Sequence, residues 1–137
     1  MTRFGTFASL WSAALLCTAP LTSLASNRAP ATIHVLCNTD GEPPICEALV
    51  KAIATAHPQR TVVLQDRKAP VPDQLNIAYV AEKSTNDVVS GHLIWVDPKG
   101  QRGTGPTITL SVMDARMNRY MLGAFASQML RHSGLPI

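Results

Sequence analysis

Residues 33–65 read IHVLCNTDGEPPICEALVKAIATAHPQRTVVLQ, a pattern that predicts a strand, a helix and a second strand. The strands, 33–37 and 61–65, are rich in β-branched and aliphatic residues. Pro43-Pro44 opens the helix, because proline is tolerated in the first turn, and His57-Pro58 ends it. Apolar residues recur at helical spacing on one face: Ile45, Leu49, Ala52, Ile53 and Ala56. A strand–helix–strand unit predicts a right-handed crossover and a parallel strand pair.

Three further strands are expected after this unit. Residues 74–82 alternate between apolar and other side chains, which predicts a strand with Leu75, Ile77, Tyr79 and Ala81 on its buried face. Segments 88–96 and 107–112 are similarly rich in strand-forming residues. Turn residues separate these segments, so we expect an antiparallel meander.

The last predicted element is a helix over 115–133, with Asp114 as its N-terminal cap and Gly134 as a left-handed C-terminal cap. The resulting order is β-α-β-β-β-β-α. We therefore predict an α/β fold of the two-layer α+β type, a five-stranded mixed sheet with two helices on one face. Residues 26–137 are enough for one disulfide-stapled domain and too few for two.

The N-terminal 25 residues have the pattern of a secretory signal peptide. Arg3 provides a positive charge, residues 7–16 are mainly apolar, and Ser23-Leu24-Ala25 offers small residues at a cleavage site. The apolar run is too short for a stable membrane anchor. We expect cleavage after Ala25 and a periplasmic or secreted mature protein, with no membrane insertion afterwards. Leu16 precedes Cys17, whereas a lipid-attachment site needs a small residue there, so no lipid anchor is expected.

Charge and composition narrow the classes of partner. After removal of Arg3, 11 basic and 9 acidic residues leave a net charge of +2, and the basic residues are dispersed. Nucleic-acid binders usually concentrate their basic residues, so no nucleic-acid partner is expected.

Cleavage of the predicted signal peptide leaves an even pair of cysteines, Cys37 and Cys46. One ends the first strand and the other lies in the first turn of the helix. In an oxidising compartment this pair predicts a disulfide that staples the strand to the helix. Redox enzymes of the thioredoxin type place only two residues between their cysteines, so catalysis is the weaker interpretation.

No metal or cofactor site is indicated by sequence spacing. The four histidines, His34, His57, His92 and His132, do not stand in metal-ligand motifs. The glycine-rich segment Gly100–Gly105 joins two predicted strands, unlike a phosphate loop, which leads into a helix. We interpret it as a mobile hairpin, with Lys99 and Arg102 available to an acidic partner.

Two places remain for catalysis. Asp114, Arg116 and Arg119 cluster between the last strand and the last helix, and His92 lies on a strand. The serine-hydrolase elbow and the zinc-peptidase motif are both missing from the chain. A small periplasmic enzyme, hydrolase-like, with a site near Asp114–Arg119 or at His92, is therefore the alternative hypothesis.

The leading hypothesis rests on the sheet face that the two helices leave free. That face carries Ala78 and Val80, together with either Leu93 and Trp95 or Ile94 and Val96. Uncovered apolar faces of small sheets often bind partners. We expect an exported accessory or binding protein whose protein interface has Trp95 near its centre. His92 and Lys99 are further candidates, and Arg102 is expected at the rim.

Overall fold

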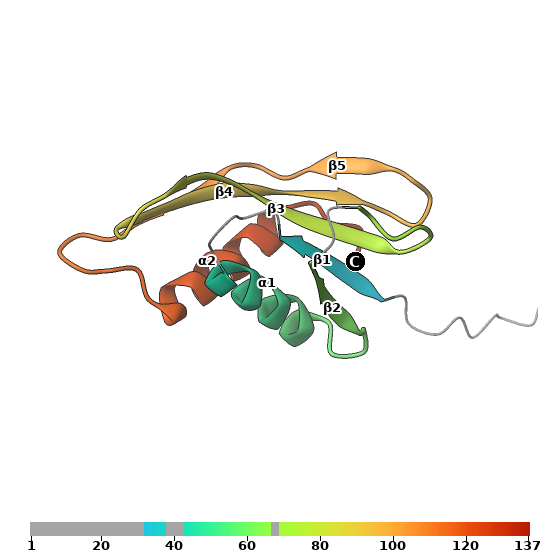
Figure 1. Cartoon of the computed structure of the whole chain (residues 1–137), viewed down its shortest axis with the longest axis horizontal. Coiled ribbons are helices and arrows are strands. Elements are labelled where there is room, and N and C mark those ends of the chain that lie inside the picture. The colour runs from blue at the N-terminus through green and yellow to red at the C-terminus, as the bar shows by residue number, and fades with distance from the viewer. Residues whose placement is uncertain (1–31, 38–42, 67–68) are drawn as a thin grey trace, which may run out of the picture.

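The computed structural model describes residues 32–37, 43–66 and 69–137. The predicted signal peptide, its cleavage site and Cys17 lie outside the described residues. Two helices pack on one side of a mixed sheet (Figure 1), which confirms the predicted fold class. The elements, in chain order, are β1 (Ile33–Cys37), α1 (Pro43–Ala56), β2 (Val62–Gln65), β3 (Leu75–Ser84), β4 (Val88–Val96), β5 (Arg102–Thr104), β6 (Ile108–Ser111) and α2 (Arg119–His132).

The sheet order is β2-β1-β3-β4-β5, with β6 also paired to β4. The predicted parallel pair is present: β1 runs parallel to β2, and also to β3 on its other side. β3 and β4 form the predicted antiparallel hairpin, with a register shift between Ala81 and Lys83. The strand β1 therefore lies inside the sheet, and β2 is an edge strand.

The sheet contains one strand more than the sequence pattern predicts. β5 lies within the Gly100–Gly105 segment, which was interpreted as a mobile hairpin, and pairs with the second half of β4. β6 pairs with the first half of the same strand, so both lie along one edge of β4. Pro106 falls between them and has no N–H to donate, which separates the two ladders. The predicted hairpin is therefore present, and residues 102–104 add a short strand to it that the sequence pattern does not predict.

Helix α2 begins later than predicted. Its N-cap is Asn118, whose side-chain oxygen accepts a hydrogen bond from the Met121 N–H at 3.0 Å. Asp114 has a φ of 56° and lies in the loop before the helix, so the capping role predicted for it is wrong. The prediction for the other end holds: Gly134, just after the helix, has a φ of 64°.

The core lies between the sheet and the helix pair. Leu75, Ile77 and Tyr79 face inward from β3, as the alternation predicts, and are almost fully buried. Ala81, predicted on the same buried face, is exposed where the β3–β4 register shifts. The ring of Tyr79 meets Phe125 of α2 edge to face, with centroids 6.4 Å apart. The other fully buried aliphatic side chains come from β1, α1, β4 and α2: Ile33, Val35, Ile45, Leu49, Ile53, Leu93 and Met129. This shared apolar burial holds the two layers together.

Candidate functional site

The sheet has one face toward the helices and one away from them, and we call the second the outer face (Figure 1). Cross-strand partners share a face, so the register identifies its members. Leu36, Ala78, Ile94 and Thr104 form one cross-strand row, and Val80 pairs with His92 in the next. A third row joins Asn76, Val96 and Arg102. Apolar side chains of two strands, Ala78 and Val80 on β3 and Ile94 and Val96 on β4, therefore run through the middle of the outer face. His92 and Arg102 lie toward its two ends, whereas Asn76 is buried.

Of the two alternatives for β4, the structure selects Ile94 and Val96 for the outer face. Leu93 is 1% exposed and belongs to the core, whereas Ile94 is 38% exposed. Trp95 shares its face with Leu93 and packs against the core as a half-buried side chain. The expected position of Trp95 at the centre of the uncovered face is therefore wrong.

Trp95 is enclosed by the neighbouring strand. It pairs with Ile77 on one side and Gly103 on the other. A Cβ added at Gly103 would overlap the indole ring, so the ring lies directly against the β5 backbone. The glycine permits this close approach. Trp95 acts here as a packing residue between β4 and β5.

His92 lies on the outer face, held by a carboxylate. Its Nδ1 is 2.9 Å from Oε1 of Glu82, and the Thr107 hydroxyl donates to the same oxygen at 2.6 Å. A carboxylate only accepts, so Nδ1 carries the proton. The hydrogen bond from Thr107, followed by that from His92, lowers the pKa of Glu82 from its usual 4.5. This three-residue contact has no local signal in the sequence, because it depends on the pairing of β3 with β4 and on the path of the chain after β5.

The arrangement at His92 lacks the order of a catalytic triad, in which the histidine contacts both the acid and the nucleophile. The hydroxyl of Ser90, two residues earlier on the same strand, lies 2.9 Å from that of Thr109. In the His92 cluster the carboxylate is central and accepts two hydrogen bonds. Within the described part of the chain, the geometry orients the His92 imidazole on the surface, and the hydrogen bond that holds it is to a carboxylate and not to a nucleophile.

Lys99 lies in the turn after β4, and Arg102 lies at its end, where β5 begins. The Asp97 carboxylate accepts hydrogen bonds from the backbone N–H groups of Lys99 and Gln101, at 2.9 and 2.7 Å. Arg102 then enters β5 opposite Val96, at the end of the outer face. Both cationic side chains are exposed. Arg102 therefore lies at one end of the outer face, and Lys99 lies in the turn that precedes β5.

The second catalytic candidate, Asp114–Arg119, lies on the loop before α2. A surface hollow of about 620 Å³ is lined there by Asp87 and residues 112–116. The loop is tied to the β3–β4 turn by the Val112 and Met117 N–H groups, which donate to the carbonyls of Asp87 and Asn86. Within residues 69–137, no ion pair joins Asp114 to either arginine of this segment. Asp114 and Arg116 thus line the same hollow, whereas Arg119 is the first residue of α2 and does not line it.

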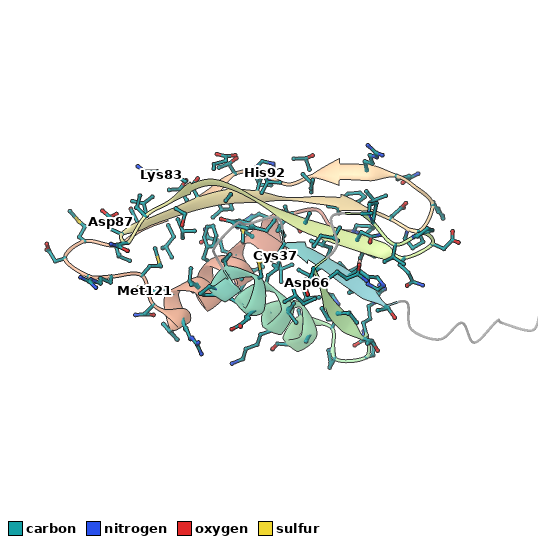
Figure 2. The ribbon with its side chains drawn as sticks, in the orientation of Figure 1. Cys37, Asp66, Lys83, Asp87, His92 and Met121 are labelled. Atoms are coloured by element: carbon teal, nitrogen blue, oxygen red, sulfur yellow. A yellow bond between two sulfur atoms is a disulfide. The ribbon has the colours of Figure 1, made fainter. Side chains whose placement is uncertain are left out.

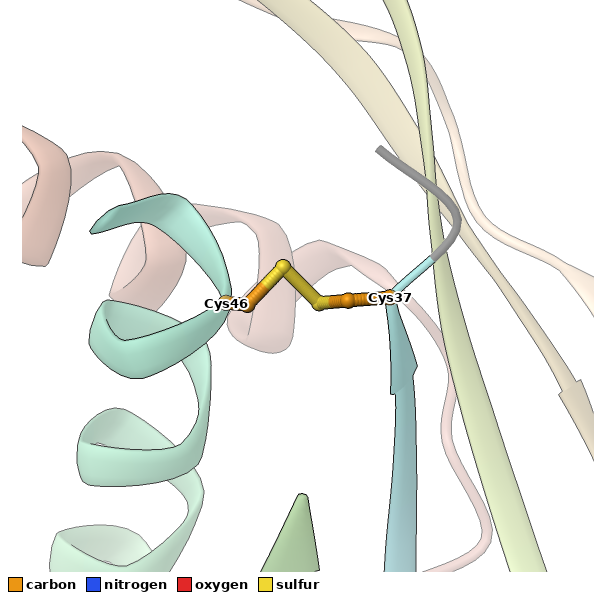
Figure 3. The surroundings of a disulfide bond; sticks show 2 residues. All are labelled: Cys37 and Cys46. Atoms are coloured by element: carbon orange, nitrogen blue, oxygen red, sulfur yellow. A yellow bond between two sulfur atoms is a disulfide. The ribbon is translucent and has the colours of Figure 1, made fainter. Parts of the chain in front are cut away.

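The predicted disulfide joins Cys37, at the end of β1, to Cys46 in α1 (Figure 3). The two Cα atoms are 6.0 Å apart, and Cys46 is 2% exposed. A buried bridge between a central strand and the covering helix fits the structural interpretation. Among the described residues, no group of three or more His, Cys, Asp or Glu side chains is placed to hold a metal ion.

A feature that the sequence analysis missed lies between the helices. The solvent sides of α1 and α2 enclose a groove of about 680 Å³. Its floor is made mainly of small residues. On α1 they recur every four positions, at Ala48, Ala52 and Ala56, and on α2 they are Gly123, Ala124 and Ser127. The four-residue repeat is present in the sequence, but the helical spacing of Ala52 and Ala56 also predicts that they lie on the core face.

The chain matches no protein-family model and no curated protein sequence. Neither described helix has the length and apolar content needed to cross a membrane.

Proposed function

We propose that this chain is an exported periplasmic accessory protein that binds another protein through the outer face of its sheet. The supporting observation is the apolar middle of that face, where Ala78, Val80, Ile94 and Val96 lie on two adjacent strands, while both helices lie on the opposite side (Figure 1). Apolar surface of this kind is a common feature of interaction sites. Ile94, 38% exposed, is its most accessible large side chain among those four.

The charges around this face favour a partner with an apolar contact surface and acidic flanks. Figure 2 shows Lys83 and His92 on the upper, outer side of the sheet, and Arg102 lies at one end of it. The acidic groups nearby are already engaged: Glu82 by Thr107 and His92, and Asp97 by its own turn. Such rim cations mainly set encounter rate and salt dependence.

Two features of the chain fit export. The N-terminal residues have the signal-peptide pattern, and the Cys37–Cys46 disulfide is compatible with an oxidising compartment. N-terminal sequencing of the protein recovered from the periplasm should therefore begin at Ser26. Recovery of the intact chain from the cytoplasm alone would overturn the proposal of export.

The binding face is tested by site-specific photo-crosslinking. A photoreactive amino acid at Ile94 should give one discrete adduct in the periplasm, and one at Leu64 should give none. Leu64 is a matched control because it is 42% exposed on β2, away from the outer face. Ile94→Asp should weaken capture of the cross-linked partner about tenfold or more, and Leu64→Asp should not. Equal adducts at both positions would refute the outer face as the interface.

The alternative, a small hydrolase-like enzyme at His92 or Asp114–Arg119, stays a prediction. Its strongest support is the carboxylate that orients His92. The engagement of Ser90 with Thr109 speaks against a nucleophile beside the imidazole, so the contacts favour binding over catalysis.

A further inference from the structure

The groove between α1 and α2 is not part of the outer face and has no role in the outer-face proposal. It extends from Pro44 to Ala56 along α1 and from Arg119 to Arg131 along α2. Each helix has 14 residues, so the groove is about 20 Å long at 1.5 Å per residue. A surface of small side chains over that length lets another backbone approach closely. The shape of the groove alone does not identify what binds there. Gly123 and the charges around the groove do.

The first observation is Gly123, in the interior of α2. Glycine costs helix stability relative to alanine. A Cβ added at Gly123 would meet no atom within 4 Å, and its φ is not positive. Nothing in the described part of the chain therefore requires glycine at this position.

The other described glycines have an internal reason. A Cβ would overlap an aromatic ring at Gly91 and at Gly103, and it would press against the Ser133 backbone at Gly105. The remaining two, Gly100 and Gly134, have a positive φ. Gly123 is the exception. The space it leaves opens into the groove, where close approach by an external backbone accounts for it.

The second observation is the charge around the groove. Its lining includes three exposed cations, Lys51, Arg119 and Arg131, against one acidic residue, Glu47. None of the three forms an ion pair with another described residue. Arg119 stands at the first position of α2, where a cation opposes the helix dipole, and no acidic residue lies in that first turn. Its position therefore does not serve helix stability and leaves positive charge at the groove.

We infer that this groove is a docking site for an acidic amphipathic helix of another protein. The small residues of the floor accept the apolar ridge of the incoming helix, and the cations of the rim face its acidic flanks. Tyr120, 87% exposed beside the groove, offers an aromatic ring with a polar tip as an anchor. This inference is independent of the outer-face proposal, because the two surfaces lie on opposite sides of the molecule.

The probe for this site is a synthetic helical peptide of about 18 residues with an Ala/Leu face and Glu flanks. A matched peptide carries Lys in place of Glu. Titration of the oxidised protein, followed by amide NMR shifts, should move the signals of the lining residues, Gly123 and Ser127 among them. The Glu peptide should bind about tenfold or more tightly than the Lys peptide. Equal binding, or shifts that map elsewhere, would overturn the inference.

The groove is then blocked with Gly123→Leu. The open space at the Cβ predicts that this variant folds. Its leucine side chain should weaken binding of the Glu peptide about tenfold or more. Gln128→Leu is the matched control, because Gln128 is exposed on the same helix and does not line the groove. Ile94→Asp should leave peptide binding unchanged, which separates this site from the outer face. Unchanged binding by Gly123→Leu would refute the site.

A second copy of this chain is the competing occupant. Sedimentation of the wild-type protein without peptide should show a monomer, at the protein concentrations used in the peptide titration. A dimer that Gly123→Leu abolishes would overturn the acidic partner and assign the groove to self-association.

Discussion

At the scale of single residues, Glu82 connects three parts of the outer face. It lies near the end of β3, accepts from His92 on β4, and accepts from Thr107 just before β6. Two hydrogen bonds to the charged form stabilise the carboxylate over the carboxylic acid. The same contact fixes the tautomer of His92 and so determines which imidazole nitrogen is left for a partner.

The lowered pKa of Glu82 makes part of the stability pH-dependent. Its folded pKa is below its usual 4.5, so the stabilising contribution is present above pH 4.5 and is lost as the pH falls through the folded value. Thr107→Val and His92→Ala should each raise the pKa of Glu82, because each removes a hydrogen bond that lowers it. Side-chain NMR titration measures both. A pKa of Glu82 that neither substitution changes would contradict the assignment.

Two Gly→Ala substitutions should have opposite effects on stability. Gly103→Ala places a methyl group into the Trp95 ring and should cost about 1–3 kcal/mol through overpacking. Gly123→Ala meets open space within a helix and should stabilise the protein by about 0.5–1 kcal/mol. Urea unfolding of the two variants gives both values. A neutral Gly103→Ala would show that the ring does not lie against β5.

At the scale of elements, α2 and β5 show how tertiary contacts set boundaries. The loop before α2 is held by backbone hydrogen bonds to the β3–β4 turn, which brings Asn118 to the position of the cap. β5 has three residues, Arg-Gly-Thr, without the apolar alternation of a strand, and exists through its pairing with β4. Local sequence preference is weak for both features.

The cap assignment predicts a difference between two loop residues. Asn118→Ala removes the acceptor for the Met121 N–H and should cost about 1 kcal/mol of stability. Asp114→Gly should be neutral or stabilising, because glycine adopts the positive φ of this position without strain. Thermal unfolding of both variants checks this. A larger loss for Asp114→Gly would restore Asp114 as the residue that organises the helix start.

At the scale of the whole molecule, the disulfide joins the two layers. Cys37 belongs to the sheet and Cys46 to the helix pair that covers it (Figure 3). The bridge lowers the conformational entropy of the unfolded chain and thereby stabilises the native state. The core continues through Leu49 and Ile53 on the same helix, so we expect the fold to persist without the bridge.

Replacing both cysteines by alanine should lower the free energy of unfolding by about 2.5–3 kcal/mol, as expected for closure of a short loop. The amide NMR spectrum should keep its dispersion away from the bridge. Thiol labelling of the denatured, unreduced wild type should find no free thiol at either position. Two labelled thiols per mature chain would contradict the disulfide.

The amino-acid sequence by itself predicted the fold class, the disulfide, the alternation of β3, the limits of β4 and the helix after Pro43. Each of these features depends on residues that are close together in the sequence: the periodicity of a segment, the turn residues at its ends, or the pair of cysteines. A signal peptide and export stay predictions from the sequence alone, and N-terminal sequencing tests them.

Only the tertiary structure decided which side of β4 faces outward, where β5 pairs, and that α1 and α2 leave a groove between them. Alternation defines two faces of a strand, but packing against the helices determines which one is buried, so Leu93 and Trp95 lie inside and Ile94 and Val96 outside. The contact of Thr107 with Glu82 spans 25 residues of sequence. Such long-range contacts follow from strand register and layer packing, which no local pattern specifies.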